Sequence, residues 1–384
     1  MTQALAEGPL GAALLPVERG DLDQARSLLS AAVDGGVSTG ANASLFHGAP
    51  ALEFVLSRAG RAGSRVRAAT DRVATARLAA ASRRRESGQL PALAEFDLIQ
   101  GIAGLTALLL SREETPQLAL ETLGYLVSLA RPLTTGGREL PGWWSPDGPG
   151  RERAPGGHGN NGVAHGAAGI LAALAIGVRK GVRVDGQEAA IEVFASWLEK
   201  WGASWWVTLP QLSAGVPPQP PPLRPSWCYG TLGIARALQL AGLAAGNDRR
   251  RQAAEDAALT ALRDPARLAR VTDASLCHGW AGILTVTQAI AADSPAPERF
   301  AAPMCLARDR LATGIAALTK PGFLEGQAGA QLALDGTDST GWTRALLIRL
   351  PGDSRECTST TTTLWHQRRS NGSTPSSPFP AIAE

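Results

Sequence analysis

Two cysteines and a histidine are the residues of this chain best suited to act together in chemistry. Cys228 lies in the stretch RPSWCYG, and Cys277 and His278 lie in LCHGWAG. Each cysteine stands two residues before a glycine, Gly230 or Gly279. Thiolate and imidazole groups suit Zn²⁺, and three protein ligands with an open fourth position are typical of a catalytic zinc site. The three residues therefore predict one Zn²⁺ per chain.

The prediction depends on an internal repeat, because a spacing of 49 residues between cysteines matches no general zinc motif. Six related strings recur along the chain: HGAPAL, QGIAGL, HGAAGI, YGTLGI, HGWAGI and EGQAGA. Their shared anchor glycines are Gly48, Gly101, Gly166, Gly230, Gly279 and Gly326. The two cysteines occupy the same position in consecutive repeats, so they would be neighbours in space. The alternative is that both are small buried hydrophobic residues, as free cysteines often are.

The repeats also predict the elements that would position these side chains. Each anchor glycine opens a bland apolar stretch with helical periodicity, and in five repeats a second glycine three residues later would let helices approach closely. Amphipathic stretches lie near 22–35, 64–85, 116–131, 186–200, 249–264 and 297–318. We predict an all-α fold of six inner and six outer helices, an α/α toroid with the zinc site at one pole. An open superhelix of helix pairs is the competing architecture.

The length allows one large domain or two to three average ones, and the six helical hairpins of a toroid predict a single domain spanning about residues 1–350. A stretch rich in Gly, Pro and Trp at 132–164 predicts a long loop, and residues 351–384 have the composition of a disordered tail. The 37 basic and 34 acidic residues give a net charge of +3, and the arginines are scattered, which argues against nucleic-acid binding. The longest apolar run, 166–178, is too short to span a membrane. Four cysteines without a CxxC pair favour reduced thiols and a cytoplasmic location.

Four motifs together resemble those of the lanthionine synthetase C-like proteins, the cyclases of lanthipeptide biosynthesis. They are FDLIQGIAG, GVAHGAAG, RPSWCYG and LCHGWAG, and the resemblance covers about residues 40–345. It implies an α/α toroid with zinc at one pole. It also implies intramolecular addition of cysteine thiols to dehydroalanine and dehydrobutyrine in a precursor peptide, which forms thioether rings.

The resemblance assigns roles to seven residues. Cys228, Cys277 and His278 match the zinc ligands, Asp97 and His165 match the acid/base residues, and Arg224 and Tyr229 match an arginine and a tyrosine near the first ligand. Thiol addition leaves an enolate that must be protonated at its α-carbon. His165 would protonate it while Asp97 orients the imidazole, and the opposite assignment of the two roles is also open. Structural roles compete with two of these assignments, because Asp97 could cap a helix and Arg224 could simply pair with an acid.

The same residues are open to other functions. Asp97 and Glu325 could act as opposed carboxylates of a glycosidase, but that chemistry has no use for two cysteines. A relative that binds a thiol compound such as glutathione without cyclising a peptide is the non-enzymatic alternative. A cyclase would need a dehydrated peptide from a separate dehydratase, and an exporter is a further expected partner. We expect structural roles for His47, Cys305 and Cys357, and none at the site for His158 or His366.

Overall fold

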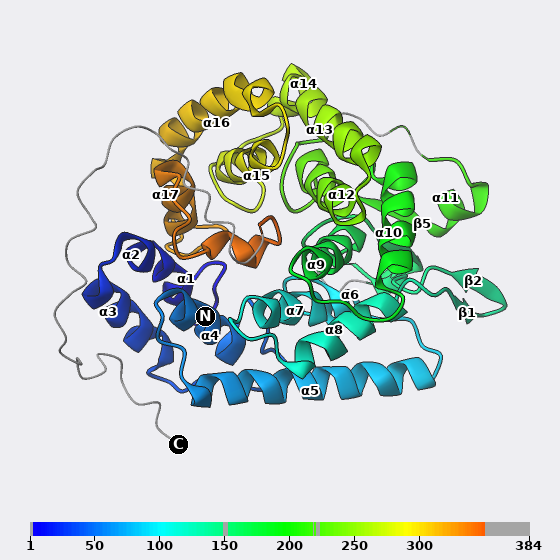
Figure 1. The fold of residues 1–384 in the computed structure, drawn as a ribbon, viewed down its shortest axis with the longest axis horizontal. Helices are drawn as coiled ribbons and strands as arrows, with labels where there is room; N and C mark the ends of the chain where they lie inside the picture. Colours follow the sequence, from blue (N-terminus) through cyan, green and yellow to red (C-terminus); the bar gives the residue numbers. More distant parts are fainter. Residues whose placement is uncertain (1–2, 149–152, 218, 220–222, 350–384) are drawn as a thin grey trace.

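The computed structural model describes residues 3–148, 153–217, 219 and 223–349, and this part of the chain is mainly helical. A helix begins at or directly after each of the six anchor glycines. These helices lie around the centre of the molecule in Figure 1. They are α4 (Gly48–Arg58), α7 (Ile102–Leu110), α9 (Ala167–Arg179), α12 (Thr231–Ala245), α15 (Trp280–Ala292) and α17 (Gln327–Asp335). They are more buried than the outer helices, and every residue of α7 is buried.

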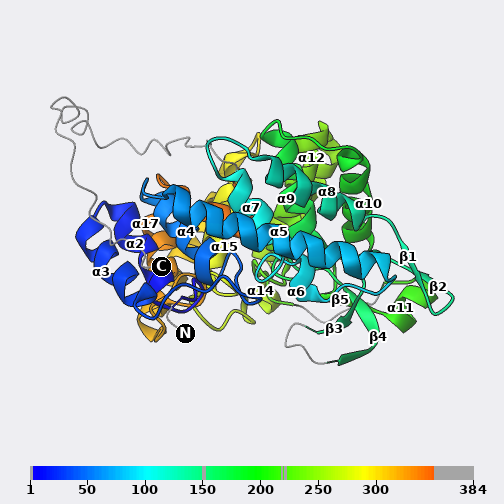
Figure 2. The same cartoon turned by 90° about the horizontal axis from the view of Figure 1, so that it is seen from below.

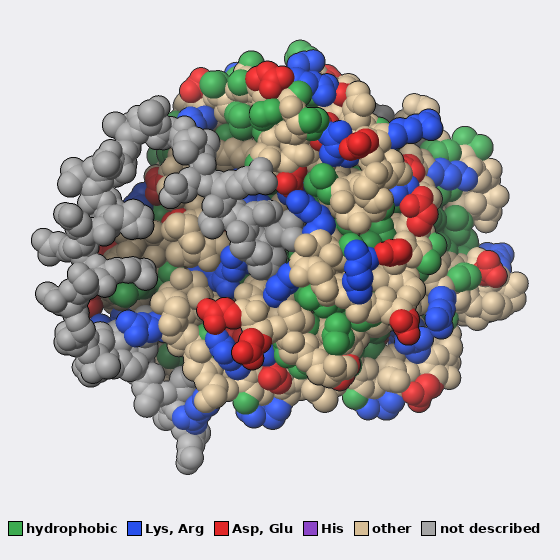
Figure 3. Space-filling view, viewed as in Figure 1, with side chains coloured by type: hydrophobic (Ala, Val, Ile, Leu, Met, Phe, Trp, Pro, Cys, Tyr) green, Lys and Arg blue, Asp and Glu red, His purple; other side chains and the backbone are tan. Residues whose placement is uncertain are grey.

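Longer and more polar helices lie outside them (Figure 1). These are α3 (Leu22–Val33), α5 (Ser64–Glu86), α8 (Gln117–Ser128), α10 (Gln187–Trp201), α13 (Asp248–Leu262) and α16 (Ala301–Gly314). The 23-residue helix α5 buries only five side chains, whereas α9 buries twelve of its thirteen. Outer helices therefore present charged faces to solvent. On the face in Figure 3, Lys and Arg side chains are interspersed with Asp and Glu.

The ring is closed by the N-terminal segment. Neighbouring inner helices pack in chain order, and the short helices α1 (Pro9–Ala12) and α2 (Leu14–Arg19) contact both α17 and α4. Backbone hydrogen bonds join the start of the chain to the segment before α17: Phe323 N–H donates to Leu5 O and Leu324 N–H to Ala6 O. An open superhelix would leave its first and last helices apart, so this contact favours the ring.

Backbone hydrogen bonds also join the segments before the inner helices at one pole. The bonds run from Leu98 N–H to Ala164 O (3.1 Å), Val163 N–H to Cys228 O (2.9 Å), Cys228 N–H to Cys277 O (3.1 Å) and Cys277 N–H to Leu324 O (2.9 Å). All these residues lie two or three positions before an anchor glycine. The shared register thus becomes physical proximity, and it places Cys228 beside Cys277.

In the five repeats that have a second glycine, this glycine packs most closely against its own repeat, and for Gly104, Gly233 and Gly329 an added β-carbon would also lie within 3.0 Å of a side chain of another repeat. An added β-carbon would lie nearest to the carbonyl oxygen six residues earlier in every case. The contacts are Gly104 with Leu98 O, Gly169 with Val163 O, Gly233 with Trp227 O, Gly282 with Leu276 O and Gly329 with Phe323 O. The glycine therefore lets the segment before each helix fold back onto its first turn.

Gly233→Ala is expected to destabilise the protein and disturb the site. The new β-carbon would lie 2.0 Å from Trp227 O, so the segment carrying Cys228 must shift. Such overpacking costs about 1–3 kcal/mol, measured from urea denaturation. Gly124→Ala is the matched control, because Gly124 lies in the interior of α8 with open space around it, and alanine is the better helix former. Equal stability of wild type and Gly233→Ala would contradict this packing argument.

The segment at 132–164 is more ordered than the predicted loop. It contains the antiparallel pair β1 (Leu133–Thr135) and β2 (Arg138–Leu140), followed by β3 (Ser145–Asp147) and β4 (Arg153–Asn160). Strand β4 lies between β3 and β5 (Trp206–Thr208), with Asn160 opposite Trp206. Figure 2 shows this sheet at one side of the helices, near α11 (Leu209–Ala214).

The remaining described elements are short: α6 (Leu93–Phe96), α14 (Pro265–Leu268), η1 (Pro297–Phe300), η2 (Ile315–Ala317) and η3 (Trp342–Leu346). Residue Leu346 accepts a hydrogen bond from Trp227 Nε1 through its carbonyl oxygen, so the C-terminal described segment packs beneath the Cys228 segment. The predicted tail at 351–384 lies outside the described residues. Within the described ranges, no helix combines the length and apolar character needed to cross a membrane.

Candidate metal centre and acid/base pair

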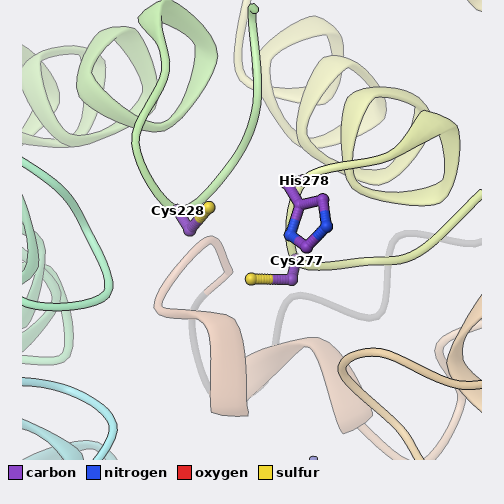
Figure 4. A group of neighbouring side chains, drawn as sticks. All are labelled: Cys228, Cys277 and His278. Carbon is purple, nitrogen blue, oxygen red and sulfur yellow. The ribbon is translucent and has the colours of Figure 1, made fainter. Parts of the chain in front are cut away.

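Cys228, Cys277 and His278 meet at the pole formed by the segments before α12 and α15 (Figure 4). Their candidate ligand atoms all lie within 4.8 Å of one another. Cys228 is 3% exposed, while Cys277 and His278 are partly exposed. The group is thus sheltered, yet open on the side of the second cysteine and the imidazole. The packing interpretation of two unrelated buried cysteines does not fit this convergence.

The three side chains shift one another's pKa values through mutual hydrogen bonds. The pKa of Cys228 is lowered, first by a hydrogen bond with Cys277 and then by one with His278. The bond with Cys228 and burial raise the pKa of Cys277. The pKa of His278 is raised to about 9, first by Asp273 and then by Cys228. Metal binding requires these protons to leave, and a divalent cation would compensate the second thiolate.

The donor set fits zinc on its chemistry. Two soft thiol sulfurs and one imidazole nitrogen converge within a few ångströms, and this combination occurs in zinc enzymes with a fourth position left for a water or substrate. Within the described ranges this is the group of His, Cys, Asp and Glu side chains whose ligand atoms gather closely enough to hold a metal.

Asp273 supports the histidine and was missed in the sequence. Its Oδ2 lies 2.9 Å from Nε2 of His278, which leaves Nδ1 of the imidazole for the cysteine side. A carboxylate on the far nitrogen of a ligating histidine fixes the ring orientation and increases its basicity. The only sequence signal was an acid five residues before the histidine, in DASLCHG, and that spacing is not specific.

Asp97 and His165 form a hydrogen-bonded pair from the segments before α7 and α9. Asp97 Oδ2 lies 2.5 Å from His165 Nδ1, and Asp97 is 2% exposed. Its other oxygen accepts hydrogen bonds from the backbone N–H groups of Gln100 and Gly101. One oxygen of Asp97 therefore holds the turn before α7 and the other holds His165; α7 has no side-chain N-cap hydrogen bond among the described residues, so the capping alternative was wrong. His165 Nε2 is the imidazole nitrogen left for another partner.

Tyr229 lies between this pair and the cysteines. Its ring stacks with that of His165 at a centroid distance of 6.0 Å, and its hydroxyl accepts a hydrogen bond from Asn160 Nδ2 at 3.0 Å. Burial raises the pKa of Tyr229, and so would charge on Cys228 and Asp97. The side chain is therefore a neutral phenol able to donate a hydrogen bond. Asn160, fully buried on β4, was also missed because strand pairing places it here.

Arg224 also lies at this pole. Its positive charge acts to lower the pKa of Cys277, against the larger raising effects of the Cys228 bond and burial. Its Cζ lies 5.6 Å from the centre of the Trp205 ring. The structural alternative was pairing with an acid, and no ion pair of the described residues includes Arg224. The guanidinium therefore keeps hydrogen-bonding capacity near the thiols.

Glu325 and Asp97 do not form a glycosidase-like pair of free carboxylates. Glu325 is bound to Lys320 Nζ at 2.6 Å, and the same lysine binds Glu7 at 2.7 Å. Asp97 is occupied by His165 and two backbone N–H groups.

The other residues considered in the sequence lie apart from the proposed chemistry or touch it indirectly. His47 is the N-cap residue of α4, and burial lowers its pKa. His158 is buried on β4, 3.4 Å from the Asn160 side chain. Cys305 is exposed on α16, so its expected packing role was wrong. Cys357 and His366 lie outside the described residues.

Comparisons with known proteins agree with the ring of helices. A sequence model of the family described as lanthionine synthetase C-like protein matches residues 4–347. A solved structure titled nisin cyclase superposes with a TM-score of 0.74 and 21% identity, covering 90% of this chain and 92% of that chain. At that identity the likeness shows a shared fold. No curated protein sequence matches the chain.

Proposed function

Because the chain belongs to the lanthionine synthetase C-like family, we propose that it is a zinc-dependent lanthipeptide cyclase. Its substrate would be a dehydrated precursor peptide, and its product a peptide with lanthionine or methyllanthionine thioether rings. The observation that carries the proposal is that two clusters of side chains lie side by side at one pole. Cys228, Cys277 and His278 form a metal-type cluster, and the Asp97–His165 pair lies next to it through Tyr229.

Cys228, Cys277 and His278 would hold the zinc ion. When bound, zinc supplies the positive charge that favours the thiolate form of a thiol arriving at the open position. Free thiols have a pKa of about 8.5 and are mostly protonated at neutral pH.

The chain's own residues would handle the charge and proton that follow sulfur attack. The thiol gives up its S–H proton to solvent, and as the thiolate sulfur bonds to the β-carbon of the dehydro residue, the double-bond electrons move toward the neighbouring carbonyl and form an enolate. Arg224 would stabilise the enolate oxygen with its guanidinium N–H groups. His165 would deliver a proton from Nε2 to the α-carbon, while Asp97 holds Nδ1. Tyr229, as a neutral phenol, would help to position the reacting carbonyl or the imidazole.

Asp273→Asn is expected to weaken zinc binding without removing it. The amide keeps a hydrogen-bonding group near His278 Nε2 but loses the negative charge, and loss of such support typically lowers metal affinity about 10–100-fold. Competition with a chelator of known affinity measures the change. Asp309→Asn, on the exposed side of α16, is the matched control. Equal affinity in Asp273→Asn and wild type would show that the carboxylate does not support the ligand.

Incubation with a dehydrated precursor peptide tests the function directly. The wild type should lower the number of free thiols by one for each ring formed, while the peptide mass stays constant because the addition is an isomerisation. Protein freed of zinc by chelation is the control. A fully zinc-loaded protein that binds the peptide, or a small thiol such as glutathione, without consuming thiols would support the thiol-binding alternative instead.

The remaining predictions concern context. We propose that the ring of helices acts as one catalytic domain, since the acid/base pair and the metal-type cluster come from four different repeats. We propose that a dehydratase supplies the substrate, because the proposed chemistry forms no dehydro residues. The exporter, the lack of nucleic-acid binding and the cytoplasmic location remain predictions from the sequence.

A further inference from the structure

Arg224 is held by an aromatic face instead of an acid. Its Nε is buried without a hydrogen-bond partner among the described residues, and its Cζ lies 5.6 Å from the centroid of the Trp205 ring. A guanidinium over an aromatic face is attracted by the ring quadrupole. An aromatic partner holds the cation without accepting its N–H groups, whereas a carboxylate would occupy two of them.

Trp205 also contacts the tyrosine of the site. Its ring centroid lies 5.8 Å from that of Tyr229, which stacks on His165. The indole therefore touches both the guanidinium and the aromatic side chain that borders the acid/base pair. Trp206, the next residue, is 42% exposed, and its ring contacts are with Trp205 and His158.

A fully buried asparagine fixes the segment that carries Trp205. Asn161 donates its backbone N–H to Trp205 O at 2.9 Å, and its Nδ2 donates to Trp201 O at 2.9 Å and Ser204 O at 2.8 Å. Its Oδ1 accepts from Trp197 Nε1 at 2.7 Å. Every polar group of this side chain is used to hold the turn between α10 and β5. These hydrogen bonds of Asn161 thus fix the backbone position of Trp205.

We propose that Trp205 is a positioning residue for Arg224. It holds the guanidinium at the pole by a cation–π contact and leaves its N–H donors free for the developing enolate oxygen. The role of the donors rests on the proposed function. The aromatic contact itself stands on the geometry of the two side chains.

A double-mutant cycle tests whether Trp205 acts through Arg224. Trp205→Leu should lower kcat for ring closure about tenfold, with KM and zinc content nearly unchanged, because a cation–π contact is lost while an apolar side chain remains. Trp205→Phe should restore most of kcat. In an Arg224→Ala background, Trp205→Leu should cause no further loss. Leu306→Ala, an exposed apolar residue of α16, is the control and should leave kcat unchanged.

A spectroscopic measurement separates this inference from the proposed function. In wild type, the Arg224 Nε–H proton resonance, assigned with Arg224→Lys, should be shifted upfield by the Trp205 ring current, and Trp205→Leu should remove the shift. An unshifted resonance in wild type, or additive effects in the cycle, would overturn the positioning role while leaving the cyclase proposal intact. Failure of wild type to consume peptide thiols would overturn the cyclase proposal, and with it the role of the free donors.

Discussion

Cys228→Ala is expected to reduce bound zinc from about one ion per chain to near zero. The substitution removes the most buried of three converging donors and leaves one thiol and one imidazole, too few for a stable site. His278→Ala should have the same effect. Metal analysis of protein purified without chelators measures the content, and ring formation should fall with it.

The backbone hydrogen bonds of Cys228 do not depend on its side chain, so Cys228→Ala should keep the fold of the pole. Cys228 joins the pole through its N–H and carbonyl groups, which alanine retains, so the ring of hydrogen bonds remains in the variant. Cys305→Ala, on the exposed face of α16, is the matched cysteine control and should keep its zinc. Full zinc retention in both Cys228→Ala and His278→Ala would show that the metal, if present, binds elsewhere.

His165→Ala is expected to keep zinc and lose most of the rate of ring closure. The imidazole lies outside the metal-type cluster, and its Nδ1 is bound to buried Asp97. Loss of a general acid usually lowers a rate about 10²–10⁴-fold. Single-turnover assays with dehydrated peptide measure the step, and the zinc content is determined on the same samples.

The second carboxylate oxygen of Asp97, which holds the turn before α7, keeps this variant interpretable. Asp97 still accepts two backbone N–H groups after His165 is removed, so the start of α7 should stay folded. His47→Ala, at another anchor position but outside the pair, is the control and should cyclise at the normal rate. An unaltered rate in His165→Ala would remove the imidazole from the mechanism.

The register of the repeats explains why much of the pole could be predicted. A glycine that lets each segment fold back onto its helix fixes where the preceding residues lie, so equal positions in consecutive repeats become neighbours. Cys228 and Cys277 meet for this reason. The pairing of Asp97 with His165 follows the same logic, since their segments are joined by the Leu98–Ala164 hydrogen bond.

The repeat register could not predict residues that reach the site through the pairing of strands far apart in the sequence. Asn160 and Trp205 reach the site because β4 pairs with β5 across some 46 residues of chain, and the glycines of β4 hide its strand character. Gly159 is in fact required there, because an added β-carbon would lie 2.8 Å from the Trp197 ring. Asp273 was missed for a different reason. Its carboxylate meets His278 through local loop geometry that a spacing of five residues does not reveal.

X-ray absorption at the zinc edge tests the central claim most directly. The account predicts a first shell with two sulfurs at about 2.3 Å and one imidazole nitrogen at about 2.0–2.1 Å, and a third sulfur when a substrate thiol is added. A shell of oxygen and nitrogen only, or one of four sulfurs in the free protein, would contradict a site built from Cys228, Cys277 and His278 with one position open.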